Sequence, residues 1–347
     1  MRDTVLGLRG EMENTARRVL SDAGCTPEVS GVGPDSCEVD IKLAPQPDDP
    51  LAGISGYRCL GPGNQGVVFG HATAETPSRM PLFVWLANRL AMRFDAVRKS
   101  GSIPWLAPSA SATTYVEYLD AGGEIITKIE FGMAHSTNIP EKELTDRIIK
   151  EIIRPVIPVK YHNPDVPGLR QWEGIEYRVR GHQITNHKRL SSVNGGTGWK
   201  INVATYGGVC PYAGGAFCGQ NPLRIDRAAT NMARYIANNV VAAGILKRCT
   251  LRLYYTVDGD QPLEIRFDKG NEPFDQEELR SCVREVFDLT PSGIIDTLRL
   301  KEQSYRASSV YGHFGREDQD LPWDRPDRAY QLRDAYGLLG QQIAWEV

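Results

Sequence analysis

Residues 251–267 read LRLYYTVDGDQPLEIRF, and this stretch decides the fold. Apolar and polar side chains alternate from Leu251 to Val257 and again from Leu263 to Phe267, as in half-buried strands. The residues Asp258-Gly259-Asp260 between them are typical of a hairpin turn. Asp275 to Phe287 then carries apolar residues at helical spacing. The stretch therefore predicts a strand, a hairpin turn, a second strand and a helix.

The same order of elements occurs earlier in the chain. Alternating stretches at 115–118 and 125–131 flank the turn Ala121-Gly122-Gly123, and a helix follows Pro140. This repetition predicts two similar units. The small, uncharged segment Trp105–Ser111 before the earlier unit is predicted to be a connecting loop.

The N-terminus resembles a third unit that has lost its beginning. A helical apolar stripe runs from Val5 to Leu20, and Cys37 to Leu43 is predicted to be the strand after it. No hairpin precedes that helix, so the sheet edge of this unit needs another cover. Further helices are predicted from Pro81 to Lys99 and from Ile225 to Ala243, each followed by a glycine.

Composition excludes several classes of protein. The 347 residues carry 40 Lys+Arg against 43 Asp+Glu, so there is no large cationic field to hold nucleic acid or an anionic membrane. The apolar stretches are far shorter than the about 20 residues of a membrane span. The seven cysteines form no CxxC pair, which favours free thiols in a reducing compartment. We expect a soluble, cytoplasmic protein.

Glycine-rich loops are the candidate ligand sites. Gly61 to Thr73 contains three glycines in six residues beside Asn64 and Gln65. Gly214 to Gly219 leads through Arg224 and Asp226 into a helix, and free N–H groups at such a helix start suit an anion. The alternative for Asp226 is that it caps the helix.

Basic residues are frequent between His182 and Lys200. Lys200 follows a third glycine-rich segment, and His182, His187, Lys188 and Arg189 form a local basic cluster. Either group is an anion contact or a solvated surface charge. No metal-ligand spacing, Walker loop or nucleophile elbow is present, and we expect no metal site.

Taken together, these stretches resemble the S-adenosylmethionine synthetases (methionine adenosyltransferases). Gly61–Thr73 is similar to the family's GAGDQGxxFGYAT, and Ser102–Tyr118 to GTLPWLRPDxKSQVTxxY. Trp199–Arg227 resembles RKIIVDTYGG…GGGAFSGKDPxKVDR, and Phe287–Arg316 resembles the closing FDLRP…AYGHFGR. The resemblance covers roughly residues 55–345.

The resemblance implies an α+β fold of three similar domains of mixed β-sheet plus helices around a pseudo-threefold axis. We expect a truncated N-terminal domain at 1–50, a middle domain at 51–175 and a C-terminal domain at 176–347. It also implies a homodimer or tetramer with sites between subunits. In this family the methionine sulfur attacks C5′ of ATP, and the triphosphate that leaves is then cleaved.

Several charged positions of the family carry neutral residues here. The HPDK segment, with its magnesium Asp, has no counterpart in this sequence. Motif Asp, Lys or Arg residues are replaced at Asn64, Ala107, Ser109, Ser111, Trp199, Ala204, Gln220 and Asn221, and one motif Asp falls at Val193 or Asn194. Each lost charged contact to the transition state costs about 2.7–4 kcal/mol. We therefore expect triphosphate chemistry to be abolished or very poor, with no required cofactor and no magnesium.

The matching positions define the predicted site. Lys200 and Asp226 are the predicted catalytic groups, since Lys200 stands at the Lys of GRK and Asp226 at the Asp of KVDR. An aromatic Trp199 in place of Arg suits a sulfonium cation or a base, although it also simply fills volume. The predicted ligand-binding residues are Asn64, Gln65, Ser109, Asn194, Trp199, Gly215, Phe217 and Arg224.

The leading hypothesis is a divergent transferase-family enzyme that binds S-adenosylmethionine or a related adenosyl ligand at a subunit interface. It would catalyse displacement or elimination at a carbon next to sulfur. The first alternative is a non-catalytic or regulatory subunit that forms a hetero-oligomer with an intact synthetase. The second is an active methionine adenosyltransferase whose phosphate site is rebuilt from His187, Lys188 and Arg189.

Overall fold

The computed structural model of the chain forms two compact units, each described here by itself. The first comprises Met1–Pro47 with Leu86–Gly195, and the second Asp48–Trp85 with Gly196–Val347. None of the described helices combines the length and the hydropathy needed to cross a membrane. The structure describes residues 2–43, 66–119, 123–136, 138–159, 174–184, 198, 200–212, 216–256, 261–268, 270, 273–341 and 343.

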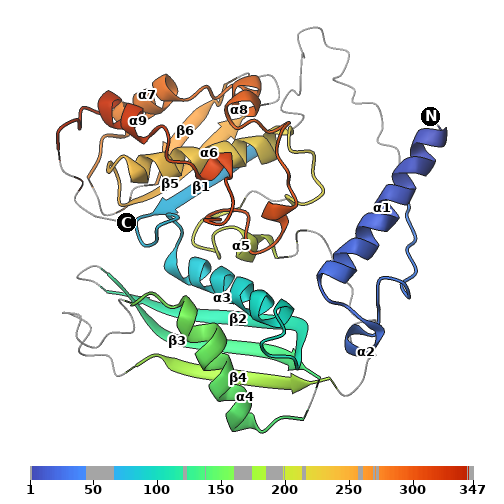
Figure 1. The fold of residues 1–347 in the computed structure, drawn as a ribbon. Helices are drawn as coiled ribbons and strands as arrows, with labels where there is room; N and C mark the ends of the chain where they lie inside the picture. The colour runs from blue at the N-terminus through green and yellow to red at the C-terminus, as the bar shows by residue number, and fades with distance from the viewer. Residues whose placement is uncertain are drawn as a thin grey trace. The chain divides into compact units, whose positions relative to one another are not determined.

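The first unit contains a mixed sheet of three strands. These are β2 (Leu106–Tyr118), β3 (Glu124–His135) and β4 (Glu176–Gln183), in the order β2-β3-β4. The pair β2–β3 is antiparallel and the pair β3–β4 is parallel. Parallel neighbours need a crossover between them, and α4 (Glu141–Ile148) lies in that crossover, across the face of the sheet in Figure 1.

Apolar side chains attach α4 to the first unit. The helix continues as a π-helical turn, Ile149–Ile153, and a 3-10 turn, Arg154–Val156. Leu144, Ile148 and Ile152 are buried along this run. Hydrophobic burial on one stripe therefore holds the helix in place. The predicted order of strand, hairpin, strand and helix is confirmed in this unit.

The second unit contains an antiparallel sheet. Its strands are β1 (Gly66–Thr73), β5 (Arg248–Tyr255) and β6 (Glu264–Phe267), in the order β1-β5-β6. The long helix α6 (Ile225–Ala242) lies across this sheet (Figure 1). A Cβ atom at Gly70 would stand 2.1 Å from the carbonyl oxygen of Ala233, so only glycine lets β1 approach α6 this closely.

A buried arginine holds α6 against the segments around it. Arg234 is 0% exposed, and its Nε donates to Asp324 Oδ1 at 2.9 Å. Its other nitrogens donate to the carbonyl oxygens of His71 (2.8 Å), Ser78 (2.7 Å) and Arg79 (3.0 Å). A buried guanidinium is tolerated because a carboxylate and three carbonyls share its charge.

The remaining elements complete the two units. α3 (Leu82–Lys99) follows β1 along the chain, and its Phe94 ring lies 5.8 Å from that of Phe131 on β3. The predicted repeat is confirmed in the second unit, where β5, β6 and α7 follow one another. The other helices are α5 (Ile201–Ala204), α7 (Gln276–Val286), α8 (Pro291–Thr297), α9 (Ala329–Ala335) and the 3-10 turns Ala307–Ser309 and Pro322–Asp324.

The N-terminal prediction is half right. The predicted helix is α1 (Arg2–Asp22), followed by the short α2 (Pro27–Ser30). The strand predicted at Cys37–Leu43 is wrong, because these residues pair with no strand that the structure describes. Arg17 of α1 instead donates to the carbonyl oxygen of Pro34 at 2.5 Å, so side chains rather than a β-ladder attach this segment.

The connecting loop predicted at Trp105–Ser111 is also wrong, because β2 already begins at Leu106. The register between β2 and β3 shifts between Leu106 and Ala110. Such a bulge accommodates Pro108, which has no N–H to donate to a ladder. The small residues therefore form a strand end rather than a loop.

The α+β fold predicted from the resemblance, with small mixed sheets and covering helices, is confirmed. The division into domains at 1–50, 51–175 and 176–347 stays a prediction. It also stays a prediction that another part of the protein covers the sheet edge of the N-terminal unit. The described residues of that unit form two helices and no sheet.

Candidate functional site

The start of α6 brings together the polar residues of the glycine-rich segment. Asn221 Oδ1 accepts from the backbone N–H of Leu223 at 3.0 Å, which closes a turn just before the helix. Arg224 is the N-cap residue and makes no side-chain capping bond. Asp226 lies within the first helical turn, so the alternative that it caps α6 is wrong.

Asp226 is held by two neighbours. Gln220 Nε2 donates to Asp226 Oδ2 at 2.5 Å, and Arg224 Nε lies 3.8 Å from Oδ1. Oδ1 is itself inaccessible to solvent and accepts no hydrogen bond from the described residues, although the side chain as a whole is 37% exposed. The carboxylate therefore keeps one oxygen with unused acceptor capacity.

Arg227, the next residue of α6, contacts Gln220 and Tyr305. Its Nη1 donates to the backbone carbonyl of Gln220 at 2.5 Å, and its guanidinium lies 4.4 Å from the ring centroid of Tyr305. Burial lowers the pKa of Arg227 from its usual value, and burial raises the pKa of Tyr305 to about 12. Arg227 thus fixes the Gln220 loop.

An aromatic cluster lies behind this polar group. Phe217 is 3% exposed, and its ring lies 4.7 Å from His313, 5.6 Å from Tyr212 and 6.0 Å from Phe314. Burial, followed by the charge of Arg227, lowers the pKa of His313 to about 4. His313 is therefore a neutral ring at pH 7, and the cluster supports the loop as an apolar base.

Lys200 comes close to the same loop through the segment that carries it. A Cβ atom at Gly198 would lie 2.6 Å from the Cβ of Ala216, so these two segments pack against each other. The φ of +88° at Gly198 favours glycine there. The Lys200 side chain is exposed and forms no hydrogen bond or ion pair with any residue that the structure describes. Its ammonium group is free to meet a ligand.

The described residues among the predicted ones divide between the two units. Lys200, Phe217, Arg224 and Asp226 lie in the second unit, whereas Ser109 is an exposed residue of β2 in the first unit. The other predicted positions lie outside the described residues: Asn64, Gln65, Asn194, Trp199 and Gly215, together with His187, Lys188 and Arg189.

Sequence reasoning missed Tyr212, Arg227, Tyr305 and His313. His313 stands in the quoted YGHFGR stretch, where it was used only to recognise the family. Its backbone N–H donates to the carbonyl oxygen of Ala204 at 2.7 Å, which ties that stretch to α5. No sequence signal indicated the contact between Arg227 and Tyr305, which are far apart in the chain.

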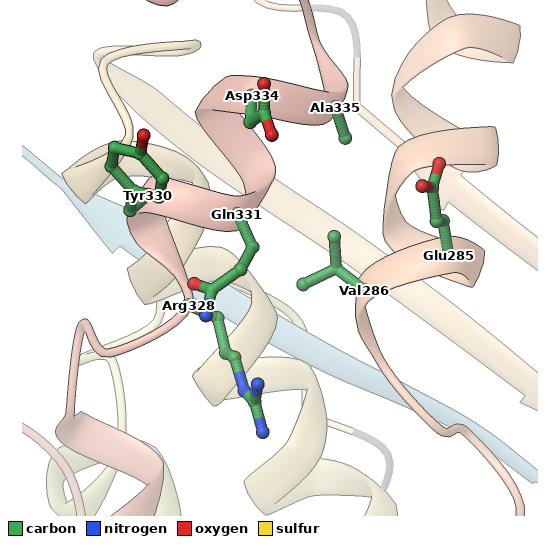
Figure 2. Close-up of a pocket in the computed structure, with 7 residues that line it drawn as sticks. All are labelled: Glu285, Val286, Arg328, Tyr330, Gln331, Asp334 and Ala335. Carbon is green, nitrogen blue, oxygen red and sulfur yellow. The ribbon is translucent and has the colours of Figure 1, made fainter.

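Two further features bear on ligand binding. Among the described residues no group of three or more His, Cys, Asp or Glu side chains is arranged to hold a metal ion. A cavity of about 470 Å³ lies between the end of α7 and α9. Figure 2 shows the residues that line it, among them the acidic Glu285 and Asp334 and the basic Arg328. None of the residues singled out from the sequence lines it.

Comparison with known proteins identifies the family. The model of the S-adenosylmethionine synthetase central domain matches residues 59–169, and that of the C-terminal domain matches 190–325. The S-adenosylmethionine synthase of Helicobacter hepaticus is 35% identical over 329 residues, covering 94% of this chain and 83% of that protein. That of Petrotoga mobilis is 34% identical over 342 residues, with the same coverage. The chain therefore belongs to the S-adenosylmethionine synthetase family.

Proposed function

We propose that this chain binds S-adenosylmethionine or a related adenosyl sulfonium and acts on it without triphosphate chemistry. The observation that carries the proposal is the hydrogen bond from Gln220 to Asp226, at a position where the resembling motif has a lysine. A neutral amide stands there in place of a cation. An anionic polyphosphate thus loses a partner, and a cationic ligand meets less repulsion.

The groups that remain suit the two ends of an amino acid sulfonium. The Asp226 side chain, which is 37% exposed, offers a carboxylate to a cationic group. Lys200 offers an ammonium group to a carboxylate. Arg224 lies beside Asp226, and Arg227 contacts the Gln220 carbonyl and the Tyr305 ring. The charges of both arginines are therefore partly offset.

The proposed chemistry breaks a carbon–sulfur bond. In displacement, a nucleophile bonds to the carbon next to sulfur and the thioether leaves with the electron pair. In elimination, a base removes a proton from the neighbouring carbon while the same bond breaks. We assign Asp226 and Lys200 to this step. Asp226 would accept the proton, and Lys200 would orient the ligand. The family resemblance favours a homodimer or tetramer with the site between subunits.

A second candidate is S-adenosylmethionine synthesis itself. The 35% identity to the Helicobacter hepaticus synthase over 94% of the chain favours it. In that case His187, Lys188 and Arg189 would supply the lost phosphate contacts, with magnesium as cofactor. A non-catalytic subunit paired with an intact synthetase is the remaining alternative.

Calorimetry on the full chain separates these functions. We expect S-adenosylmethionine to bind, and ATP with magnesium not to bind. Asp226→Asn should weaken S-adenosylmethionine binding about tenfold or more, because a charge-assisted contact is lost. Glu302→Gln, an exposed acidic position on the same unit, is the matched control and should bind as the wild type does.

Turnover is then followed by chromatography of the sulfur-containing products. Consumption of S-adenosylmethionine by the wild type, but not by Lys200→Met, supports the proposal. Release of phosphate and diphosphate from ATP, methionine and magnesium would instead establish the synthetase. Absence of binding for all ligands, with co-purification of an intact synthetase, would favour the non-catalytic subunit.

A further inference from the structure

A second cavity in the second unit gathers three arginines. It has a volume of about 330 Å³ and lies at β5, the edge strand β6 and the start of α7. Arg252 comes from β5, Arg266 from β6 and Arg280 from α7. The cavity shares no residue with the candidate site around Asp226.

The two strand arginines stand directly opposite each other. Arg252 pairs with Arg266 in the antiparallel register of β5 and β6. Like charges at such positions repel unless an anion lies between or beside them. The Arg252 guanidinium is held on one side by the Phe69 ring, whose centroid is 5.9 Å away, and on another by Asp268 Oδ1 at 2.5 Å. Its position is therefore fixed before any ligand binds.

Two of the three arginines are paired with carboxylates. Asp268 pairs with Arg252, and Glu277 pairs with Arg280 at 2.5 Å. The Arg266 side chain is exposed and forms no ion pair or hydrogen bond with the residues that the structure describes. Glu264 also lines the cavity, two residues before Arg266, without forming an ion pair with it.

Donor capacity is also unused. The Nε atoms of Arg252 and Arg280 are inaccessible to solvent and have no hydrogen-bond partner among the described residues. Gln276 Oε1 accepts from Arg280 Nη2 at 3.0 Å, and Gln276 Nε2 donates to the Phe267 carbonyl at 2.9 Å, so this end of α7 is fastened to β6. A rigid cluster of guanidinium groups suits an oxyanion, which the exposed Arg266 side chain can meet directly.

We propose that this cavity binds a phosphate group, either free or carried by a small organic molecule. Phosphate presents four oxygens to donors that converge from two strands and a helix. A bound phosphate would also remove the repulsion between Arg252 and Arg266. The site adds a binding function that is separate from the chemistry proposed at Asp226.

The test compares two arginines of the same unit. Inorganic phosphate is titrated into the full chain by calorimetry in a phosphate-free buffer. Arg266→Gln should weaken binding about tenfold or more, because an exposed but unpaired cation is removed. Arg284→Gln, on an exposed face of α7 outside the cavity, should leave binding unchanged. Higher salt should weaken the wild-type interaction.

Three readouts decide the proposal. Phosphate should raise the thermal midpoint of the wild type and of Arg284→Gln, but not that of Arg266→Gln. Ribose 5-phosphate that binds more tightly than inorganic phosphate would identify an organic phosphate as the source, and equal binding would identify the free ion. No phosphate binding by the wild type, or equal losses in both variants, would overturn the proposal. Arg266→Gln should bind S-adenosylmethionine as the wild type does, so the two proposals fail separately.

Discussion

The two hairpin-and-helix units bury their covering helices in different ways. In the first unit, α4 and the turn after it are anchored by apolar side chains such as Leu144, Ile148 and Ile152. In the second, α6 buries polar residues as well, and Arg234 and Asn238 are both 0% exposed. The first unit therefore relies on packing, and the second on packing plus a buried polar network.

The difference shows what a polar core accomplishes. Asn238 Nδ2 donates to the carbonyl oxygen of Asp324 at 2.7 Å, and Asn239 Nδ2 to that of Arg325 at 3.0 Å. Asn239 Oδ1 in turn accepts from the backbone N–H of Arg328 at 2.8 Å. These bonds hold the backbone of residues 324–328 in one conformation. Apolar contacts alone would be less specific, because they have no directional requirement.

The largest effect is expected at the buried ion pair. Asp324→Ala leaves the Arg234 charge uncompensated inside the protein, which should lower the free energy of unfolding by about 3–5 kcal/mol. Replacing both residues, as Arg234→Met/Asp324→Ala, should recover part of this loss. Urea unfolding followed by circular dichroism measures both variants.

The first unit supplies the control for this experiment. Ile148→Ala removes an apolar side chain that is 0% exposed and should cost about 2–5 kcal/mol through the cavity it leaves. If Asp324→Ala costs less than 1 kcal/mol, or if the double variant is less stable than Asp324→Ala, the contrast between the two cores is wrong.

A pH effect of intermediate size should arise in the second unit. His71 is 0% exposed, its Nδ1 lies 2.7 Å from Thr250 Oγ1, and burial, followed by the charges of Arg248 and Arg234, lowers its pKa to about 3. The unfolded chain takes up this proton below about pH 6.5, while the folded chain stays neutral down to about pH 3. The stabilisation is therefore complete above pH 6.5 and falls as the pH drops toward 3.

Each pH unit within that window should remove about 1.4 kcal/mol through His71. The measurement is urea unfolding of the wild type and His71→Asn between pH 6.5 and 5. The variant retains a polar group beside Thr250 but cannot take up the proton, so the pH slope of its unfolding free energy should be smaller. Equal slopes would contradict the prediction.

The smallest effect is expected at a helix cap. Asp275 accepts from the backbone N–H groups of Glu277 (2.8 Å) and Glu278 (3.0 Å) at the start of α7, whereas α4 begins after Pro140 with no side-chain cap. Asp275→Ala should lower the unfolding free energy by about 1 kcal/mol. Asp275→Asn, which keeps an acceptor oxygen, should restore most of it, and an equal loss in both variants would exclude capping as the cause.

Local patterns predicted the regular elements well. The stripe from Leu279 to Phe287 and the alternation from Leu251 to Tyr255 are properties of neighbouring residues, so α7 and β5 were found where expected. Segment Cys37–Leu43 has the alternation of a strand but pairs with none among the described residues. The small, uncharged residues of Trp105–Ser111 predicted a loop, and the bulge between β2 and β3 lets Pro108 lie at a strand end instead.

The candidate site divides in the same way. Motif order predicted Lys200, Phe217, Arg224 and Asp226, because short motifs keep their residues together in the chain. The hydrogen bond from Gln220 to Asp226 and the contact of Arg227 with Tyr305 depend on how a loop folds back on α6. Pairings of this kind have no signature in spacing.

The sequence by itself determined the family, the α+β composition and the repeated order of strand, hairpin and helix, because period and turn chemistry are encoded locally. Only the tertiary structure decided that the buried Arg234 bonds to Asp324 and to the carbonyl groups of His71, Ser78 and Arg79. It also decided that Gln220 donates to Asp226, and that Arg252 faces Arg266 across a ladder. The physical reason is that charges and hydrogen bonds act through space, between residues that the fold brings together.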